Sequence, residues 1–183
     1  MATKPYTKDQ QLVTWLIRLG TLITFTLLPT CMYFMPVLGK PLTSAFDRVV
    51  FTLRYECFST LAFFAAIMHV ANGRFSSAAI DPMAGSEKLL EFRVRFLQNT
   101  FEQFIIGFVG RIILATYLKD AVEKVIPVLV VYFVIARVIF YYGYKRNPLH
   151  RAVGMSMTFM SHFAVYFAIL VCFVMYGPKY GLE

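Results

Sequence analysis

Long apolar segments alternate with short polar ones along the chain, and this pattern recurs five times. Each apolar segment reaches the roughly 20 residues that a helix needs to cross the hydrocarbon core of a bilayer. The segments show no strand signal and no internal repeat. We expect helices over residues 12–38, 49–71, 86–118, 121–144 and 147–176. The pattern therefore predicts one all-α membrane protein.

Several residues predict where these helices bend, begin or end. Pro29 and Pro36 lie in the first apolar segment, so its second half should kink or end early. Ser86 is typical of the residue that caps a helix N-terminus, and Asn147-Pro148 combines a cap with a proline at the first helical position. Gly177 should stop the last helix.

The composition agrees with a membrane protein. The chain is 58% hydrophobic, whereas soluble domains are about 45–50% apolar. Its formal charge of +8 does not indicate nucleic-acid binding, because no basic run is interleaved with solvent-facing aromatic residues. The three cysteines lack metal-ligand spacing and are expected to be buried thiols, and no metal site is predicted.

The distribution of positive charge predicts the orientation in the membrane, since loops rich in Lys and Arg stay in the cytosol. With five spans, the N-terminus, the 74–95 region and the 145–151 turn share one side. That side carries nine cationic residues outside the span interiors, and the opposite side carries five. The N-terminus is therefore expected in the cytosol and the C-terminus across the membrane.

Arg95, Asn99 and Glu102 stand at positions i, i+4 and i+7 of the third predicted helix, so they share one face. Charge inside a membrane is costly and indicates a functional site by default. The alternative is that the three side chains satisfy one another and lock a helix bundle. The spacing alone leaves both interpretations open.

A second polar stripe, formed by Arg137, Tyr141 and Tyr144, lies near the end of the fourth predicted helix. The predicted topology brings this stripe toward the same membrane face as Arg95. Arginine binds carboxylates through a planar fork. This constellation is suited to binding a soluble ligand that carries carboxylates and one ammonium group. The membrane beside it could hold a lipophilic electrophile with which that ligand reacts.

The motif Arg95-x-x-x-Asn99-x-x-Glu102, followed by Ala136-Arg137, Gly143-Tyr144 and Arg151, resembles the MAPEG superfamily of eicosanoid and glutathione metabolism. The resemblance covers about residues 50–176. It implies a four-helix bundle over residues 49–178, and a homotrimer with glutathione held between neighbouring subunits. Residues 1–48 would then add a cytosolic N-terminus and one extra transmembrane helix, and residues 179–183 a tail.

The resemblance also implies roles for individual residues. The residues implied to bind glutathione are Arg74, Arg95, Asn99, Glu102, Arg137 and Tyr144. Tyr141 could replace one of two tyrosine hydroxyls that leukotriene C4 synthase has and this chain lacks. Arg151 would be catalytic and stabilise the glutathione thiolate, because a free thiol with a pKa of about 8.5 is mostly protonated at neutral pH. This hypothesis describes a glutathione-dependent transferase or peroxidase that acts on a lipophilic electrophile.

Two departures favour a second hypothesis. Leukotriene C4 synthase has tyrosines where this chain has Gln103 and Phe140, and the extra first helix resembles the mattrin-like branch of MAPEG-domain proteins. That branch implies a non-catalytic regulator of membrane receptor signalling or trafficking, with another membrane protein as partner. A small transporter is disfavoured, because no inverted repeat is present. The resemblance places the chain in endoplasmic reticulum or Golgi and endolysosomal membranes. The sequence leaves open whether Arg111 pairs inside the bundle or reaches outward.

Overall fold

The structure is a computed structural model that describes residues 7–37, 42–81, 85–119 and 121–180. These residues form five long helices and no strand, which confirms the predicted all-α class. Two short 3-10 helices, η1 (Ala78–Ile80) and η2 (Ser86–Leu90), lie between the second and third long helices. The long helices are α1 (Lys8–Phe34), α2 (Ala45–Phe75), α3 (Glu91–Tyr117), α4 (Val122–Arg146) and α5 (Ala152–Tyr176).

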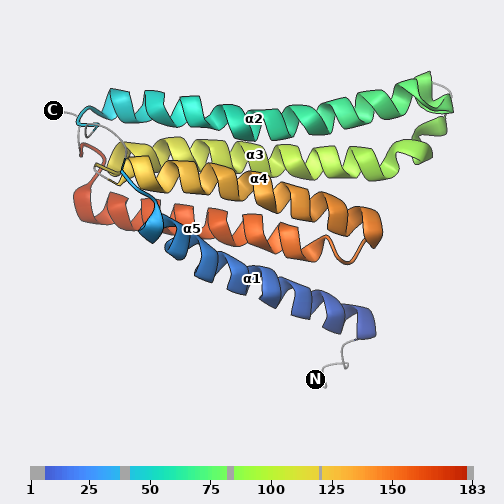
Figure 1. The fold of residues 1–183 in the computed structure, drawn as a ribbon, viewed down its shortest axis with the longest axis horizontal. Helices are drawn as coiled ribbons and strands as arrows, with labels where there is room; N and C mark the ends of the chain where they lie inside the picture. The colour runs from blue at the N-terminus through green and yellow to red at the C-terminus, as the bar shows by residue number, and fades with distance from the viewer. Residues whose placement is uncertain (1–6, 38–41, 82–84, 120, 181–183) are drawn as a thin grey trace.

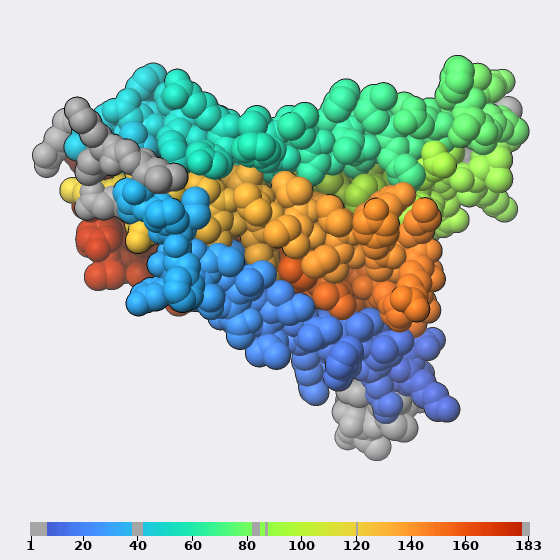
Figure 2. Space-filling view, viewed as in Figure 1, coloured from blue at the N-terminus to red at the C-terminus, as the bar shows by residue number. Residues whose placement is uncertain are grey.

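Helices α2 to α5 run side by side, and α1 lies at an angle across α5 and α4 (Figure 1). Consecutive helices run in opposite directions. The α2–α3 connection, the α4–α5 turn and the start of α1 therefore lie at the same end of the bundle, on the right in Figure 1. We call this the basic end, because it carries the cations of the predicted cytosolic side. In the space-filling view, α4 is visible between α2 and α1 (Figure 2).

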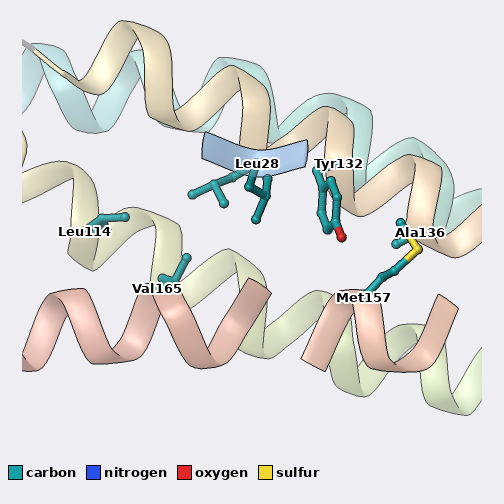
Figure 3. Packing of buried hydrophobic residues seen from close by; sticks show 7 residues of the cluster. Leu28, Leu114, Tyr132, Ala136, Met157 and Val165 are labelled. Atoms are coloured by element: carbon teal, nitrogen blue, oxygen red, sulfur yellow. The ribbon is translucent and has the colours of Figure 1, made fainter. Parts of the chain in front are cut away.

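The first helix is part of the hydrophobic core. Leu28 of α1 packs in one buried cluster with Leu114 of α3, Tyr132 of α4 and Met157 of α5 (Figure 3). The hydroxyl groups of Thr24 and Tyr132 lie 2.7 Å apart and share a hydrogen bond. A buried polar contact of this kind fixes how α1 docks. The predicted domain boundary at residue 48 stays a prediction.

The ends of α1 follow from local sequence. Thr7 and Gln10 form a capping box, in which each side chain accepts a hydrogen bond from the other residue's backbone N–H. The helix ends at Phe34, and Met35 is extended, as expected for a residue that precedes a proline. The predicted early end is confirmed, while Pro29 lies inside the helix.

Two predicted helix starts are wrong. Ser86 begins the short helix η2, and α3 itself starts only at Glu91. The Asn147 side chain accepts a hydrogen bond from the Leu149 N–H at 2.9 Å and so closes a local turn, and α5 begins five residues later. Asparagine stabilises turns and helix starts by the same kind of bond, so its presence alone does not distinguish them. The predicted stop at Gly177 is confirmed, with a φ of 75°.

The outer surface is suited to lipid. Large apolar side chains such as Phe64, Phe163 and Phe167 are more than half exposed. Exposure of so much apolar surface would be unfavourable in water, but it is favourable in contact with the lipid chains of a bilayer. Cys31 and Cys57 also lie on this outer surface, so the expectation that they are buried is wrong.

Within the described ranges, α1, α2, α4 and α5 are long and apolar enough to cross a membrane. The chain is therefore an integral membrane protein. Helix α3 has the same length as α1 but is more polar and does not meet that criterion. Its place beside α2 in the bundle supports the prediction that it also spans the bilayer (Figure 1).

We expect the two termini on opposite sides of the membrane, with the N-terminus in the cytosol, because the basic end carries more Lys and Arg. A tag on each terminus, tested for protease access in sealed and permeabilised cells, measures this directly. Protection of only the C-terminal tag in selectively permeabilised cells is the expected result. The same accessibility for both tags would contradict the five-span topology.

Candidate functional site

The predicted site residues come from four helices and lie at or toward the basic end. Arg74 is in the last turn of α2, Arg95 in the second turn of α3, Tyr144 near the end of α4, and Arg151 at the start of α5. The antiparallel order of the helices brings these ends together (Figure 1). The shared end agrees with the sequence-based expectation. The individual side chains, however, face three different environments.

Arg95, Asn99 and Glu102 do not act as one group within a single chain. Arg95 is exposed and forms an ion pair with Glu91 at 2.6 Å, one turn earlier on the same helix. Glu102 is exposed and accepts a hydrogen bond from Gln98 at 3.1 Å. Asn99 is half-buried and points toward α4 instead. The common face predicted by the spacing is therefore divided between the bundle interior and the outer surface.

Arg137 lies inside the bundle and holds three helices together. Its side chain is 2% exposed and donates to the Asn99 Oδ1 at 2.8 Å, to the Gly154 carbonyl at 3.2 Å and to the Thr158 hydroxyl. Its guanidinium also lies over the Phe140 ring, 4.8 Å from the centroid. The Nε atom is the one donor of this side chain that is buried without a partner among the described residues. The arrangement makes Arg137 a cross-link between α3, α4 and α5.

The two tyrosines of the second stripe have different partners. Tyr141 is half-buried, and its hydroxyl lies 3.4 Å from the Nε2 atom of His69 on α2. Tyr144 is 9% exposed and packs edge-on against Phe92 and Phe140. Tyr141 therefore connects α4 to α2, and Tyr144 belongs to the aromatic core. For His69 the sequence favours a packing or interface role over a site role, and the structure adds this contact with Tyr141.

Arg151 is the most accessible of the predicted site residues on α4 and α5. It occupies the N-cap position of α5, whereas the helix expected over residues 147–176 would have included it. Its guanidinium stacks over the Tyr144 ring, 5.0 Å from the centroid. No carboxylate forms a salt bridge with it in the part of the chain that the structure describes. Arg151 thus presents an uncompensated positive charge at the basic end.

A basic cavity of about 360 Å³ lies where α2 meets the start of α3. Arg74 and Arg95, two of the residues that the resemblance implies for glutathione, both line it, and Lys88 adds a third cation that the sequence analysis did not assign to the site. Glu91 also lines the cavity and partly offsets their charge. Such a cavity is suited to one or two carboxylates.

Deeper in the bundle, Arg111 of α3 forms a bidentate ion pair with Glu56 of α2, and one of its two hydrogen bonds measures 3.0 Å. Both side chains are 2% exposed or less, and the Ser59 hydroxyl also donates to the Glu56 carboxylate. The Phe133 ring separates this pair from Arg137, with the two guanidinium groups 5.4 and 5.8 Å from its centroid. Arg111 therefore pairs inside the bundle, which settles the alternative that the sequence left open.

These positions determine how well one chain fits glutathione. The cations of the basic cavity would complement its carboxylates, and the Arg151 guanidinium would complement a thiolate. Glu102 is exposed and does not line the basic cavity, and Asn99 is already bonded to Arg137. The buried side chains of Phe140 and Gln103 supply no phenol hydroxyl. A single chain therefore presents parts of the expected site but does not bring all of them together.

No group of three or more His, Cys, Asp or Glu residues with metal-binding geometry occurs among the described residues. The basic end carries several arginine and lysine side chains. These groups bind and stabilise anions.

Comparison with known proteins identifies the family. The family model described as "MAPEG family" matches residues 55–171, from within α2 to within α5. Transmembrane protein 79 of Bos taurus and of Mus musculus are each 25% identical over 127 residues, which is 69% of this chain and 32% of the relative. The chain thus spans about a third of the length of these curated relatives. No solved structure matches it significantly.

The matched region contains the motif residues from Arg74 to Arg151 and excludes α1. Transmembrane protein 79 is mattrin, so the relatives agree with the mattrin-like branch that the sequence indicated. Because the family model covers more than half of the sequence and all of the motif, the chain belongs to the MAPEG family.

Proposed function

We propose that the chain is a non-catalytic MAPEG-domain protein that regulates another membrane protein in receptor signalling or trafficking. The observation that carries this proposal is the position of Arg137. This arginine and Asn99 use their polar groups to join α3, α4 and α5, and Arg137 is 2% exposed. Two residues that would contact glutathione in an enzyme therefore act as structural cross-links. The similarity to Transmembrane protein 79 supports the same conclusion.

A second candidate function is the glutathione-dependent transferase or peroxidase, and Arg151 favours it. An unpaired guanidinium stacked on Tyr144 would attract a thiolate and lower the pKa of the glutathione thiol. In a transferase, the thiolate sulfur would form a bond to carbon of a lipophilic electrophile, and the electron pair of the broken bond would leave with the departing atom and take up a proton. The basic cavity with Arg74 and Arg95 would hold the carboxylates of glutathione.

A homotrimer remains part of both candidate functions. Glu102 is exposed in the middle part of α3, where a bilayer would surround it if α3 spans the membrane. An exposed carboxylate in hydrocarbon is costly, so contact with a neighbouring copy would stabilise it. The same contact would bring Glu102 of one copy toward a site on another. The proposed membranes are those of the endoplasmic reticulum or of the Golgi and endolysosomal system.

Glutathione titration separates the two functions. Under the regulatory proposal, the purified protein in detergent should give no ultraviolet absorbance of bound thiolate, and Arg151→Lys and Glu102→Gln should change nothing in the titration. The enzyme reading predicts the opposite. There, Glu102→Gln should weaken binding about tenfold, because a charge-assisted hydrogen bond is worth about 1.5–3 kcal/mol. Arg151→Ala should then remove the thiolate signal and cut turnover far more than it cuts binding.

The regulatory proposal also predicts a cellular effect. Deleting the protein in its own cells should change the surface level of at least one membrane receptor, measured by surface biotinylation. Restoring the protein with Arg151→Lys should rescue that level as well as the unmodified chain does. Rescue that instead requires Arg151, together with a thiolate signal in the purified protein, would overturn the proposal in favour of the enzyme.

A further inference from the structure

A cavity of about 370 Å³ lies between α1 and α5, beside the α4–α5 turn. Its walls are mostly apolar, with Val13 and Ile17 on α1 facing Met155 and Phe159 on α5. Arg151 and Ser156 also line it and supply its polar groups. A mostly apolar cavity of this size with a few polar groups is typical of a small-molecule site.

The crossing of α1 and α5 explains why the cavity exists. A Cβ atom at Gly20 would lie 2.0 Å from the Ser156 hydroxyl and 2.6 Å from the Val153 carbonyl, so the two helices touch at this glycine. The Thr24–Tyr132 hydrogen bond fixes α1 one turn further along. Helix α1 is inclined to α5 and diverges from it toward the N-terminus (Figure 1). Ile17 and Val13, which precede Gly20 on α1, line the wedge that results. The wedge is closed at the Gly20 contact and reaches Arg151 at the basic end.

Arg151 determines which kind of ligand the wedge fits. Its guanidinium is exposed and forms no salt bridge with any described residue, although it lies beside an apolar wall. A ligand with an anionic head and an apolar body would complement both features. A second cavity, of about 380 Å³, lies between α1 and α4, and no charged residue lines it. Of these two cavities beside α1, the first is therefore the one lined by a positive charge.

We propose that the wedge between α1 and α5 binds a fatty acid, with its carboxylate on the Arg151 guanidinium and its acyl chain along Ile17 and Phe159. The cavity has room for one acyl chain beside one cation, which matches a fatty acid and not a phospholipid with two chains. The fatty acid enters from the surrounding bilayer. Helix α1 forms one wall of the site and lies outside the part of the chain that matches the family model. The site thus goes beyond the proposed regulatory function and does not depend on glutathione.

The test uses the full-length protein in nanodiscs of neutral phosphatidylcholine, without glutathione. The probe is a palmitic acid analogue with a photoreactive diazirine on its chain, compared with the alcohol of the same chain. After illumination, mass spectrometry locates the labelled peptides. The acid should label α1 and α5 around Ile17 and Phe159 about tenfold more than the alcohol does, because only the acid forms a charge-assisted bond to Arg151. An excess of plain palmitic acid should compete the label away.

Two matched variants identify the cavity. Ile17→Trp fills the wedge and should abolish the acid label, whereas Leu27→Trp fills the uncharged cavity on the same helix and should leave it unchanged. Arg151→Gln should reduce the acid label to the level of the alcohol. If Ile17→Trp fails to fold, Met155→Trp fills the wedge from α5.

Equal labelling by acid and alcohol, or equal labelling of both cavities, would mean that bilayer lipid covers α1 without a specific site and would overturn the proposal. Undiminished labelling in Arg151→Gln would do the same. Because these readouts involve neither glutathione nor a receptor, their failure leaves the proposed function untouched. A thiolate signal, conversely, has no bearing on the wedge.

Discussion

Arg111→Met should destabilise the protein by about 3–5 kcal/mol, the largest loss that we expect from one substitution. The change removes the cation from a buried ion pair and leaves the Glu56 carboxylate in the bundle with the Ser59 hydroxyl as its one side-chain partner among the described residues. Breaking a buried pair by removing one partner is costly, because the remaining charge is neither hydrated nor compensated. The measurement is the free energy of unfolding in mixed micelles under increasing denaturing detergent.

The control for this prediction is Arg95–Glu91, an exposed ion pair on α3. Both of its side chains are more than half exposed, so Arg95→Met should cost no more than about 1 kcal/mol. The double variant Glu56→Leu/Arg111→Met should recover most of the stability lost in Arg111→Met, since apolar residues of similar size often replace a buried pair without loss. A double variant as unstable as the single one would mean that the pair contributes through packing and not through charge.

Gly154→Ala should be the second most damaging substitution, with a loss at or above the roughly 1–3 kcal/mol of an overpacked core. An added Cβ would lie 2.4 Å from the Phe140 backbone nitrogen and 2.6 Å from the Ala136 carbonyl oxygen. These are backbone atoms of α4, so no side chain can rotate to relieve the clash. The helices would separate, and the Arg137 bond to the Gly154 carbonyl would lengthen. Thermal unfolding followed by circular dichroism measures the effect.

Gly110→Ala provides the matched comparison. Its added Cβ would meet side-chain carbons of Tyr166 and Val165 at 3.1–3.3 Å, and side chains can shift by a few tenths of an ångström. We expect a loss well below that of Gly154→Ala. Equal effects would show that α4 and α5 can separate at Gly154 at little cost, and that Arg137 does not depend on their close approach.

The Gly154→Ala prediction bears on function, because Arg137 donates a hydrogen bond to the Gly154 carbonyl. If the bundle requires the close contact at Gly154 and the cross-link by Arg137, the residues at the centre of the glutathione motif serve the fold. Arg74, Arg95 and Arg151 then remain as arginines of the motif that line cavities and can contact an external anion. This division agrees with a regulatory protein that has kept the family architecture.

The sequence alone determined the helices and the class of protein. Apolar periodicity and segment length are local properties, so they located five helices and predicted the membrane setting. Helix ends were predicted correctly at Gly177 and before Pro36, where the effect of the residue is to end a helix. Signals with two meanings were not, because Asn147 closes a turn by the same bond with which it would cap a helix. The motif from Arg95 to Arg151 was enough to recognise the family.

The tertiary structure alone decided which polar groups meet. Helical spacing places Arg95, Asn99 and Glu102 on one face, but the packing of α4 against α3 decides that Asn99 bonds to Arg137 while the other two stay outside. The partner of Arg111 is 55 positions away, on another helix. The wedge between α1 and α5 likewise depends on a contact between Gly20 and Ser156. Side-chain partners across helices depend on the faces that pack together, and that packing is a property of the whole bundle.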